Sequence, residues 1–445
     1  MTQDTIVAIA TPPGIGGVGI VRVSGSRVRK IAEAIVGRPL HPRIASVATF
    51  RDAAGDFIDE GLALFFQAPK SFTGEDVLEL QGHGGPVVLD LMLHRCLELG
   101  ARMARPGEFT ERAFLNGKLD LARAEAVADL IESSSVLAAR LAGQSLQGVF
   151  SRRIETLIEH LTRLRMLIEA TLDFPDEEID VATEQSVASG LRQLIDMTRA
   201  IMTEAHQGQM IREGLAVVIA GAPNVGKSSL LNRLSGTDAA IVTPIAGTTR
   251  DLLKLDIHVD GLPIRIVDTA GIRQTDDPVE REGVRRAREQ LVTADLVLWI
   301  HDGIEDAEPM GEASLPSNCP VTRVRNKIDL AGIEPQLAET KTGTEISLSA
   351  ETGAGLDLLR DHLKAVAGVG TLPGGAFMAR RRHLDALNRG LQCLDVAQEN
   401  LTNQTGPELV AEELLQAQRV FGEITGQVTS DDLLGRIFAS FCIGK

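Results

Sequence analysis

Short apolar runs broken by glycine and proline dominate the first part of the chain. Apolar and β-branched residues cluster in residues 5–10, 19–23, 60–66 and 77–81, which predicts strands separated by turns. A helical period over residues 87–99 stops at Gly100. Residues 1–118 are therefore expected to form an α+β domain.

A helical spacing of apolar residues replaces this pattern over residues 119–212, with Leu157 and Leu161 among its members. The same spacing returns over residues 371–445. Residues 213–370, between them, alternate strand-like runs with helix starts, which is typical of an α/β unit. Because helical sequence flanks this unit on both sides, we expect the two helical pieces to form one domain into which the α/β unit is inserted. Four domains in a row are the alternative.

A phosphate-binding loop opens the α/β unit. Residues 221–228 fit G-x-x-x-x-G-K-[ST], after a strand-like run and before a helix start. Gly221 and Gly226 would let the backbone amides wrap an anion at a helix N-terminus. Lys227 is predicted to reach the β- and γ-phosphates, and the Ser228 hydroxyl to bind Mg²⁺. A glycine-rich turn without function is the alternative, and the motifs that follow argue against it.

Those later motifs select the nucleotide. The segment Asn326-Lys327-Ile328-Asp329 follows a strand-like run, and a carboxylate at Asp329 can accept both N1–H and N2–H₂ of guanine, a donor pair that adenine lacks. Ser349 and Ala350 are placed for a backbone contact to the guanine oxygen. The order and spacing of the motifs predict a Ras-like P-loop GTPase domain.

Two further segments are predicted to face the γ-phosphate and its metal. Residues 268–271 form a D-x-x-G motif after a strand-like run, and Thr249 lies in the expected switch loop as the second Mg²⁺ ligand. The residues predicted to bind the nucleotide are Asn224, Val225, Gly226, Lys227, Ser228, Ser229, Thr243, Pro244, Ile245, Ala246, Gly247, Thr248, Thr249, Asp268, Thr269, Ala270, Gly271, Asn326, Lys327, Asp329, Ser349 and Ala350.

The catalytic apparatus departs from that of Ras. The position after the D-x-x-G, where Ras-like enzymes carry a water-orienting Gln, holds Ile272. Glu280 is the nearest substitute, and together with Lys227 it is the catalytic candidate. A solvated acidic helix start is the alternative for this charged run.

Composition limits the remaining possibilities. The 445 residues carry a net charge of −16, so a nucleic-acid role needs a local basic patch or a basic partner. The four cysteines have no paired spacing, which argues against a disulfide framework or a zinc site. The first residues lack a signal-peptide core, and no apolar run approaches a membrane span, so a cytoplasmic setting is expected.

Several sequence blocks carry a resemblance that spans nearly the whole chain. They are residues 11–14 (TPPG), 71–76 (SFTGED), 81–85 (QGHGG), 105–110 (RPGEFT) and 441–445 (FCIGK). Together with the GTPase motifs they resemble the tRNA modification GTPase family MnmE, also called TrmE. The fold class that results is multidomain α/β plus α: an N-terminal α+β folate-binding-like domain, an all-α helical domain and an inserted P-loop GTPase domain.

The resemblance implies a homodimer formed through the N-terminal domain. It implies a FAD-dependent partner, MnmG (GidA), with which the protein adds a carboxymethylaminomethyl-type group to C5 of the wobble uridine of certain tRNAs. A tetrahydrofolate derivative (5-formyl or 5,10-methylene) would supply the one-carbon unit. By motif match, Arg22, Glu79, Lys118 and Lys445 are the folate-binding candidates. The alternative for each is an ordinary surface charge.

The resemblance also implies K⁺ in the GTPase site, held by Asn224, Thr243, Ile245 and Thr248, with the two GTPase domains pairing across the dimer to drive hydrolysis. Glu280 matches the family's water-positioning glutamate. Cys442 could be a nucleophile. The favoured interpretation is a small apolar residue beside Phe438 and Phe441, or part of a tail that becomes ordered when folate binds.

Two other functions remain open. A ribosome-assembly GTPase of the Era and EngA kind would share the GTPase motifs but should carry a basic RNA-binding domain, of which the sequence shows no trace. A folate-dependent one-carbon transferase could use the GTPase domain only for regulation. The triplet Arg380-Arg381-Arg382 with His383 could meet phosphates, although a solvated helix start is the favoured interpretation.

Overall fold

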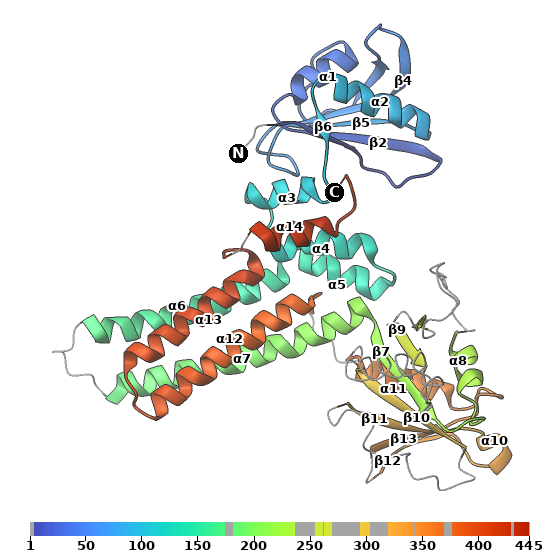
Figure 1. Ribbon diagram of the computed structural model, residues 1–445, viewed down its shortest axis with the longest axis vertical. Coiled ribbons are helices and arrows are strands. Elements are labelled where there is room, and N and C mark those ends of the chain that lie inside the picture. Colours follow the sequence, from blue (N-terminus) through green and yellow to red (C-terminus); the bar gives the residue numbers. More distant parts are fainter. Residues whose placement is uncertain are drawn as a thin grey trace, which may run out of the picture. The chain divides into compact units, whose positions relative to one another are not determined.

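The computed structural model describes residues 4–173, 181–235, 254–260, 262–268, 294–302, 319–340, 343–368, 376–428 and 431–444 (Figure 1). The chain divides into two compact units, each built from separate stretches of sequence. The first unit comprises Met1–Ala128, Ser145–Ile195 and Arg389–Lys445, and the second comprises Asp129–Gln144 and Asp196–Asn388.

A six-stranded sheet forms the N-terminal part of the first unit, in the order β3-β4-β5-β2-β1-β6. Its strands are β1 (Ile6–Ile9), β2 (Gly16–Ser24), β3 (Ser46–Arg51), β4 (Phe57–Phe66), β5 (Val77–Gly84) and β6 (Arg102–Met103). Helices α1 (Val28–Val36) and α2 (Pro86–Glu98) contribute to the core on one face, where Val21, Phe50 and Leu80 are fully buried. The predicted strands and the helix before Gly100 are confirmed.

The other face of this sheet is only partly covered. Helix α3 (Glu108–Leu115) brings Phe109 against Ile6 and Ala8 of β1. On β3 and β4, Val47 and Leu62 pair directly across the ladder and are exposed, as is Val18 on β2. This face therefore presents apolar side chains to solvent.

Helices from both ends of the chain pack together in the first unit. Helix α6 (Val149–Asp173) lies along α13 (Pro407–Thr425), and Arg165 Nη1 donates to Gln418 Oε1 at 2.5 Å. Helix α14 (Asp431–Ala439) buries Phe438 against Leu121 of α4 (Leu121–Glu132). Residues that precede and follow the α/β part therefore share one helical assembly.

The second unit contains a seven-stranded sheet in the order β12-β13-β11-β10-β7-β9-β8. Its strands are β7 (Leu215–Gly221), β8 (Lys254–Val259), β9 (Leu262–Asp268), β10 (Leu296–His301), β11 (Val321–Arg325), β12 (Gln336–Thr340) and β13 (Gly343–Ser347), and all but β8 and β12 run parallel. The α/β prediction is confirmed, and a hairpin turn at Asp260, where φ is +49°, joins β8 to β9.

Helices α8 (Lys227–Ser235), α10 (Ile328–Ala331) and α11 (Leu356–Val366) accompany this sheet. Helix α5 (Val136–Leu146) also joins its core, through Ala138, Leu141 and Ala142. The carboxyl ends of the parallel strands lie along one edge, where ligands bind in open α/β sheets.

A buried carboxylate ties together the two points where the chain enters and leaves this α/β part. Asp129 Oδ1 lies 2.8 Å from Nε of Arg212, near the end of α7 (Val181–Glu213), and 2.7 Å from Nη2 of Arg380, just before α12 (Arg381–Thr402). His383 is buried and its Nδ1 accepts from the Arg380 N–H. The favoured interpretation of a solvated helix start is therefore wrong for Arg380 and His383, because Arg380 pairs with Asp129 and His383 is buried.

Candidate functional site

The phosphate loop runs from the end of β7 into α8, and its glycines are required by its backbone. Gly221 and Gly226 have φ of +149° and +95°. A Cβ on Gly226 would lie 2.3 Å from Asn326 Nδ2, and one on Gly221 would lie 2.2 Å from the Ile300 oxygen. Only glycine fits such positions, so the loop keeps a concave backbone at the start of a helix, which is the arrangement that binds phosphate.

The charged and polar side chains of this loop are accessible. Lys227 Nζ donates to the Gly221 and Ala222 oxygens at 2.8 Å, which leaves one of its three N–H groups for an anion. Asn224, at φ +64°, and Ser228, in the first turn of α8, are exposed. The loop can therefore offer a cation and two neutral oxygen donors to a nucleotide and its metals.

Asn326 joins three of the predicted motifs. It is 2% exposed, its Nδ2 donates to the Val225 oxygen at 2.8 Å, and its Oδ1 accepts from the Ala350 N–H at 2.9 Å. The side chain predicted to belong to the guanine site is thus a buried bridge between the phosphate loop and the Ser349-Ala350 loop. A guanine oxygen would have to share or replace its bond to the Ala350 N–H.

Lys327 and Asp329 follow this bridge at the start of α10. Lys327 has φ +62° and places Nζ 3.7 Å from Asp302 Oδ2, while Asp329 is exposed in the first turn. Ser349 is buried, and its hydroxyl accepts from the Thr352 N–H at 3.1 Å. The carboxylate predicted to select guanine is therefore free to meet a base.

Part of the predicted site lies outside the described residues. This holds for Glu280, for the D-x-x-G residues Thr269, Ala270 and Gly271, for Lys445, and for Thr243, Pro244, Ile245, Ala246, Gly247, Thr248 and Thr249. Asp268 is the last residue of β9.

A second constellation lies in the N-terminal part of the first unit. Arg22 of β2 and Glu79 of β5 are direct neighbours in the ladder, and Glu79 Oε1 accepts from Arg22 Nε at 3.0 Å and lies 2.9 Å from Nη2. Arg22 Nη1 also donates to the Gly444 oxygen at 3.3 Å. Two of the four folate candidates are therefore paired, and the C-terminal segment lies against them.

Aromatic rings complete the surroundings of this pair. The Arg22 guanidinium lies 5.9 Å from the ring centroids of both Phe72 and Phe109. Lys118 is exposed and donates to the Pro69 oxygen at 3.0 Å, on the loop that carries Phe72. Cys442 is exposed, so the favoured apolar interpretation of this residue is not supported.

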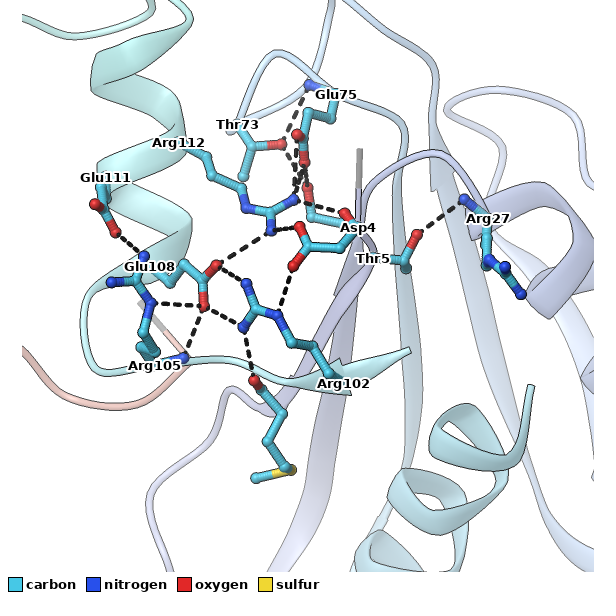
Figure 2. Close-up of polar contacts among 12 residues, drawn as sticks. Asp4, Thr5, Arg27, Thr73, Glu75, Arg102, Arg105, Glu108, Glu111 and Arg112 are labelled. Carbon is cyan, nitrogen blue, oxygen red and sulfur yellow. Dashed lines mark hydrogen bonds and ion pairs between the residues drawn. The ribbon is translucent and has the colours of Figure 1, made fainter. Parts of the chain in front are cut away.

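A network of ion pairs beside this constellation escaped the sequence analysis (Figure 2). Glu108, 3% exposed at its side chain, accepts from Arg102 Nη1 at 2.8 Å and from Arg112 Nη2 at 3.1 Å. Asp4 binds the same two arginines at 2.6 and 2.7 Å. Burial raises the pKa of the Glu108 carboxyl, but the hydrogen bonds from Arg102, the Arg105 N–H and Arg112 outweigh it and lower that pKa to about 2.

The network extends into the loop of residues 71–76. Arg112 Nη1 donates to Glu75 Oε2 at 3.0 Å, and Ser24 Oγ donates to the same oxygen at 2.7 Å. At its other end, Gly107, next to Glu108, donates its N–H to the Cys442 oxygen at 3.3 Å. The ion pairs thus fix both the loop and the turn that the C-terminal segment contacts. Asp4 lies 98 and 108 residues from its two arginines, and Glu75 lies 37 residues from Arg112. The signal in the sequence was the pair of blocks SFTGED and RPGEFT.

Comparisons with known proteins decide the family. Residues 5–118 match the family described as GTP-binding protein TrmE N-terminus, and residues 121–442 match the MnmE helical domain. Two proteins named tRNA modification GTPase MnmE, from Pectobacterium atrosepticum and Pectobacterium carotovorum subsp. carotovorum, are each 56% identical to this chain over 450 residues, covering 99% of both sequences. The chain belongs to the MnmE family of tRNA modification GTPases.

A solved structure of Aquifex aeolicus Era, 30% identical, covers 40% of this chain and 66% of that chain with a TM-score of 0.27. The assignment to the MnmE family rests on the identity to MnmE proteins over nearly the whole chain, not on this structure. The blocks that resemble MnmE now have a structural meaning, since SFTGED and RPGEFT meet through Glu75, Glu108 and Arg112. No helix within the described parts of the chain is long and apolar enough to cross a membrane.

Proposed function

We propose that this MnmE-family protein hydrolyses GTP and uses the reaction in the modification of tRNA wobble uridine. The bridge made by Asn326 between the phosphate loop and the Ser349-Ala350 loop is the observation that carries the proposal. It holds the phosphate-binding and base-binding segments in fixed register, with Asp329 exposed beside them for the guanine N–H groups.

Cations fit the described part of the nucleotide site. Ser228 and Asn224 carry neutral oxygen donors and are exposed, as Mg²⁺ and K⁺ ligands need to be. Ser228 with Thr249 would hold Mg²⁺, and Asn224 with Thr243, Ile245 and Thr248 would hold K⁺. When bound, the cations would neutralise charge that develops on the phosphates. Lys227 would place its ammonium on the same phosphates, and Glu280 would position the attacking water when two GTPase domains pair.

GTP turnover by the purified full-length protein in KCl and in NaCl at equal ionic strength tests this site. We expect strong stimulation by K⁺, which Asn224→Ala removes without loss of GDP affinity. Equal, slow rates in both salts would contradict a site completed by K⁺. Glu280→Ala should nearly abolish the stimulated rate while leaving GTP affinity unchanged.

The paired Arg22 and Glu79 support a folate site in the N-terminal part. Guanidinium and ammonium groups suit the glutamyl carboxylates of folate, and Glu79 can accept from pterin N–H groups. The exposed Lys118 would complete this folate site, together with Lys445, which lies outside the described residues. The apolar sheet face with Val47 and Leu62 supports homodimerisation through this part, because exposed apolar faces mark protein contacts.

Deletion of residues 441–445 tests the folate role. It removes the segment that contacts Arg22 and Gly107, so we expect loss of folate binding and of tRNA modification with GTP hydrolysis intact. Unchanged folate binding would contradict the proposed site. The assay supplies the FAD-dependent partner MnmG, with which we propose that the homodimer assembles in the cytoplasm.

The proposed division of labour follows four stretches of sequence. Residues 1–118 would bind folate and form the dimer, residues 213–370 would bind GTP, and residues 119–212 with 371–445 would form the helical domain. The contact of α6 with α13 supports placing residues 119–212 and 371–445 in one domain.

A further inference from the structure

A local excess of positive charge stands out in an acidic chain. Residues 27–51 contain the six basic residues Arg27, Arg29, Lys30, Arg38, Arg43 and Arg51 and the single acidic residue Glu33, whereas the whole chain has a net charge of −16. This stretch covers α1, the connection after it and the edge strand β3.

The fold brings two of these arginines, Arg29 and Arg43, together with Lys118, around residues 67–70, before the SFTGED loop. Arg43 Nη2 donates to the Lys70 oxygen at 2.9 Å, and Lys118 Nζ donates to the Pro69 oxygen at 3.0 Å. Asp76 accepts from the Ala68 N–H at 2.8 Å and from Arg29 Nε at 3.0 Å. Cations that lie far apart in sequence therefore surround one turn.

Most of this charge is not neutralised by carboxylates. Arg38 and Arg43 donate to main-chain carbonyls, at Val47 and Lys70, and neither has an ion pair with a described residue. Both are exposed, as are Lys30 and Lys70. Asp76 is the carboxylate that pairs with Arg29, whose side chain stays 56% exposed. By contrast, Arg102 and Arg112 in the neighbouring network each bind carboxylates.

We infer that the surface formed by Arg29, Lys30, Arg38, Arg43 and Lys70, the basic patch, binds the phosphate backbone of tRNA. Arginines held by main-chain carbonyls keep their net charge and a fixed direction, which suits bidentate contact with phosphate. A cluster that spans α1, a loop and a turn fits a polyanion better than a single carboxylate. The chain has no Tyr and one Trp, so contact through charge rather than base stacking is expected.

This inference rests on the proposed role in tRNA modification. The basic patch is the kind of local positive surface that an acidic protein needs in order to bind a nucleic acid. The test measures the affinity of the full-length protein for tRNA from 50 to 200 mM salt. The variant Arg38→Gln/Arg43→Gln/Lys70→Gln should weaken binding about tenfold at low salt and flatten the slope of log K against log salt by roughly two to three.

A matched control removes the same charge elsewhere. Arg140, Arg152 and Arg163 are exposed cations on α5 and α6, and their triple change to Gln should leave tRNA affinity within about twofold. The variant Arg38→Lys/Arg43→Lys should bind tRNA more weakly than the wild type and more tightly than the Gln variant, because lysine keeps the charge but loses the bidentate geometry.

Three results would overturn the inference. One is an unchanged salt slope in the patch variant, and another is an equal loss in the control. The third is a loss of folate binding with tRNA affinity intact, which would assign the patch to folate glutamates. GTP turnover in KCl, measured on the same variants, reports on the proposed GTPase separately and should stay at the wild-type rate.

Discussion

The nucleotide site and the N-terminal site are built by different means. The shape of the phosphate loop depends on its backbone, because its glycines stand at positions that exclude a side chain. One buried amide, Asn326, fixes the loop through a hydrogen bond to Val225. The N-terminal site is set by charged side chains, with Glu108 and Asp4 between Arg102 and Arg112. The glycine positions of the loop tolerate no larger side chain, but they depend on few contacts. In the ion network, the stabilising free energy is shared among many charged residues.

A change at Gly226 should have the largest effect and break the nucleotide site alone. In Gly226→Ala the new Cβ would displace Asn326 and force alanine to a positive φ, so we expect GDP affinity to fall about a thousandfold. Equilibrium binding measures it. Gly143→Ala, in α5 with nothing within 4 Å of the new Cβ, is the matched control and should bind GDP normally.

Glu108→Gln should break the N-terminal site and leave the nucleotide site intact. It removes the charge that compensates Arg102 and Arg112, so we expect the free energy of unfolding of the first unit to fall by about 3 kcal/mol. Denaturant unfolding with GDP binding as the parallel readout checks it. A loss of GDP affinity of the same size would show that the two sites are not independent.

Acid should destabilise the N-terminal site through the same residue. The pKa of Glu108 is about 2 in the folded protein and 4.5 in the unfolded chain, so its contribution of about 3 kcal/mol is complete above pH 4.5 and disappears as the pH falls toward 2. Stability curves of the wild-type protein and of Glu108→Gln should therefore converge over this window. Parallel curves would mean that the carboxyl is not held ionised.

Lys118→Ala should have the smallest effect on stability, and it separates an exposed charge of the N-terminal site from the ion-paired ones. Its ammonium is exposed and binds one main-chain oxygen, so we expect the free energy of unfolding to change by less than about 0.5 kcal/mol. Folate affinity, measured by calorimetry, should fall several-fold. Arg22→Ala, at the half-buried pair with Glu79, should lower both the free energy of unfolding and the folate affinity more.

The same contrast explains what could be predicted from the sequence. The glycines and Lys227 of the phosphate loop are close in sequence and have a fixed spacing, so the sequence alone predicts how they are arranged. Asn326 was placed in the site, but its bridge to Val225 depends on how two distant strands meet.

The contacts of the ion network between residues distant in sequence could not be predicted, for a physical reason. Asp4 and Arg112 are 108 residues apart, and no periodicity links two charges that meet only after a sheet and a helix have folded. The role of Asp129 between Arg212 and Arg380 was missed on the same ground.

The contact between Arg22 and Gly444 also has a consequence for synthesis. The two residues are 422 positions apart, so a nascent chain shorter than 444 residues lacks the segment that lies against the Arg22–Glu79 pair. The N-terminal sheet can form early on the ribosome. The surface beside Arg22 and Glu79 stays uncovered until translation has passed the GTPase residues. Folate binding, if it needs this segment, would then distinguish chains that reach residue 444 from shorter ones.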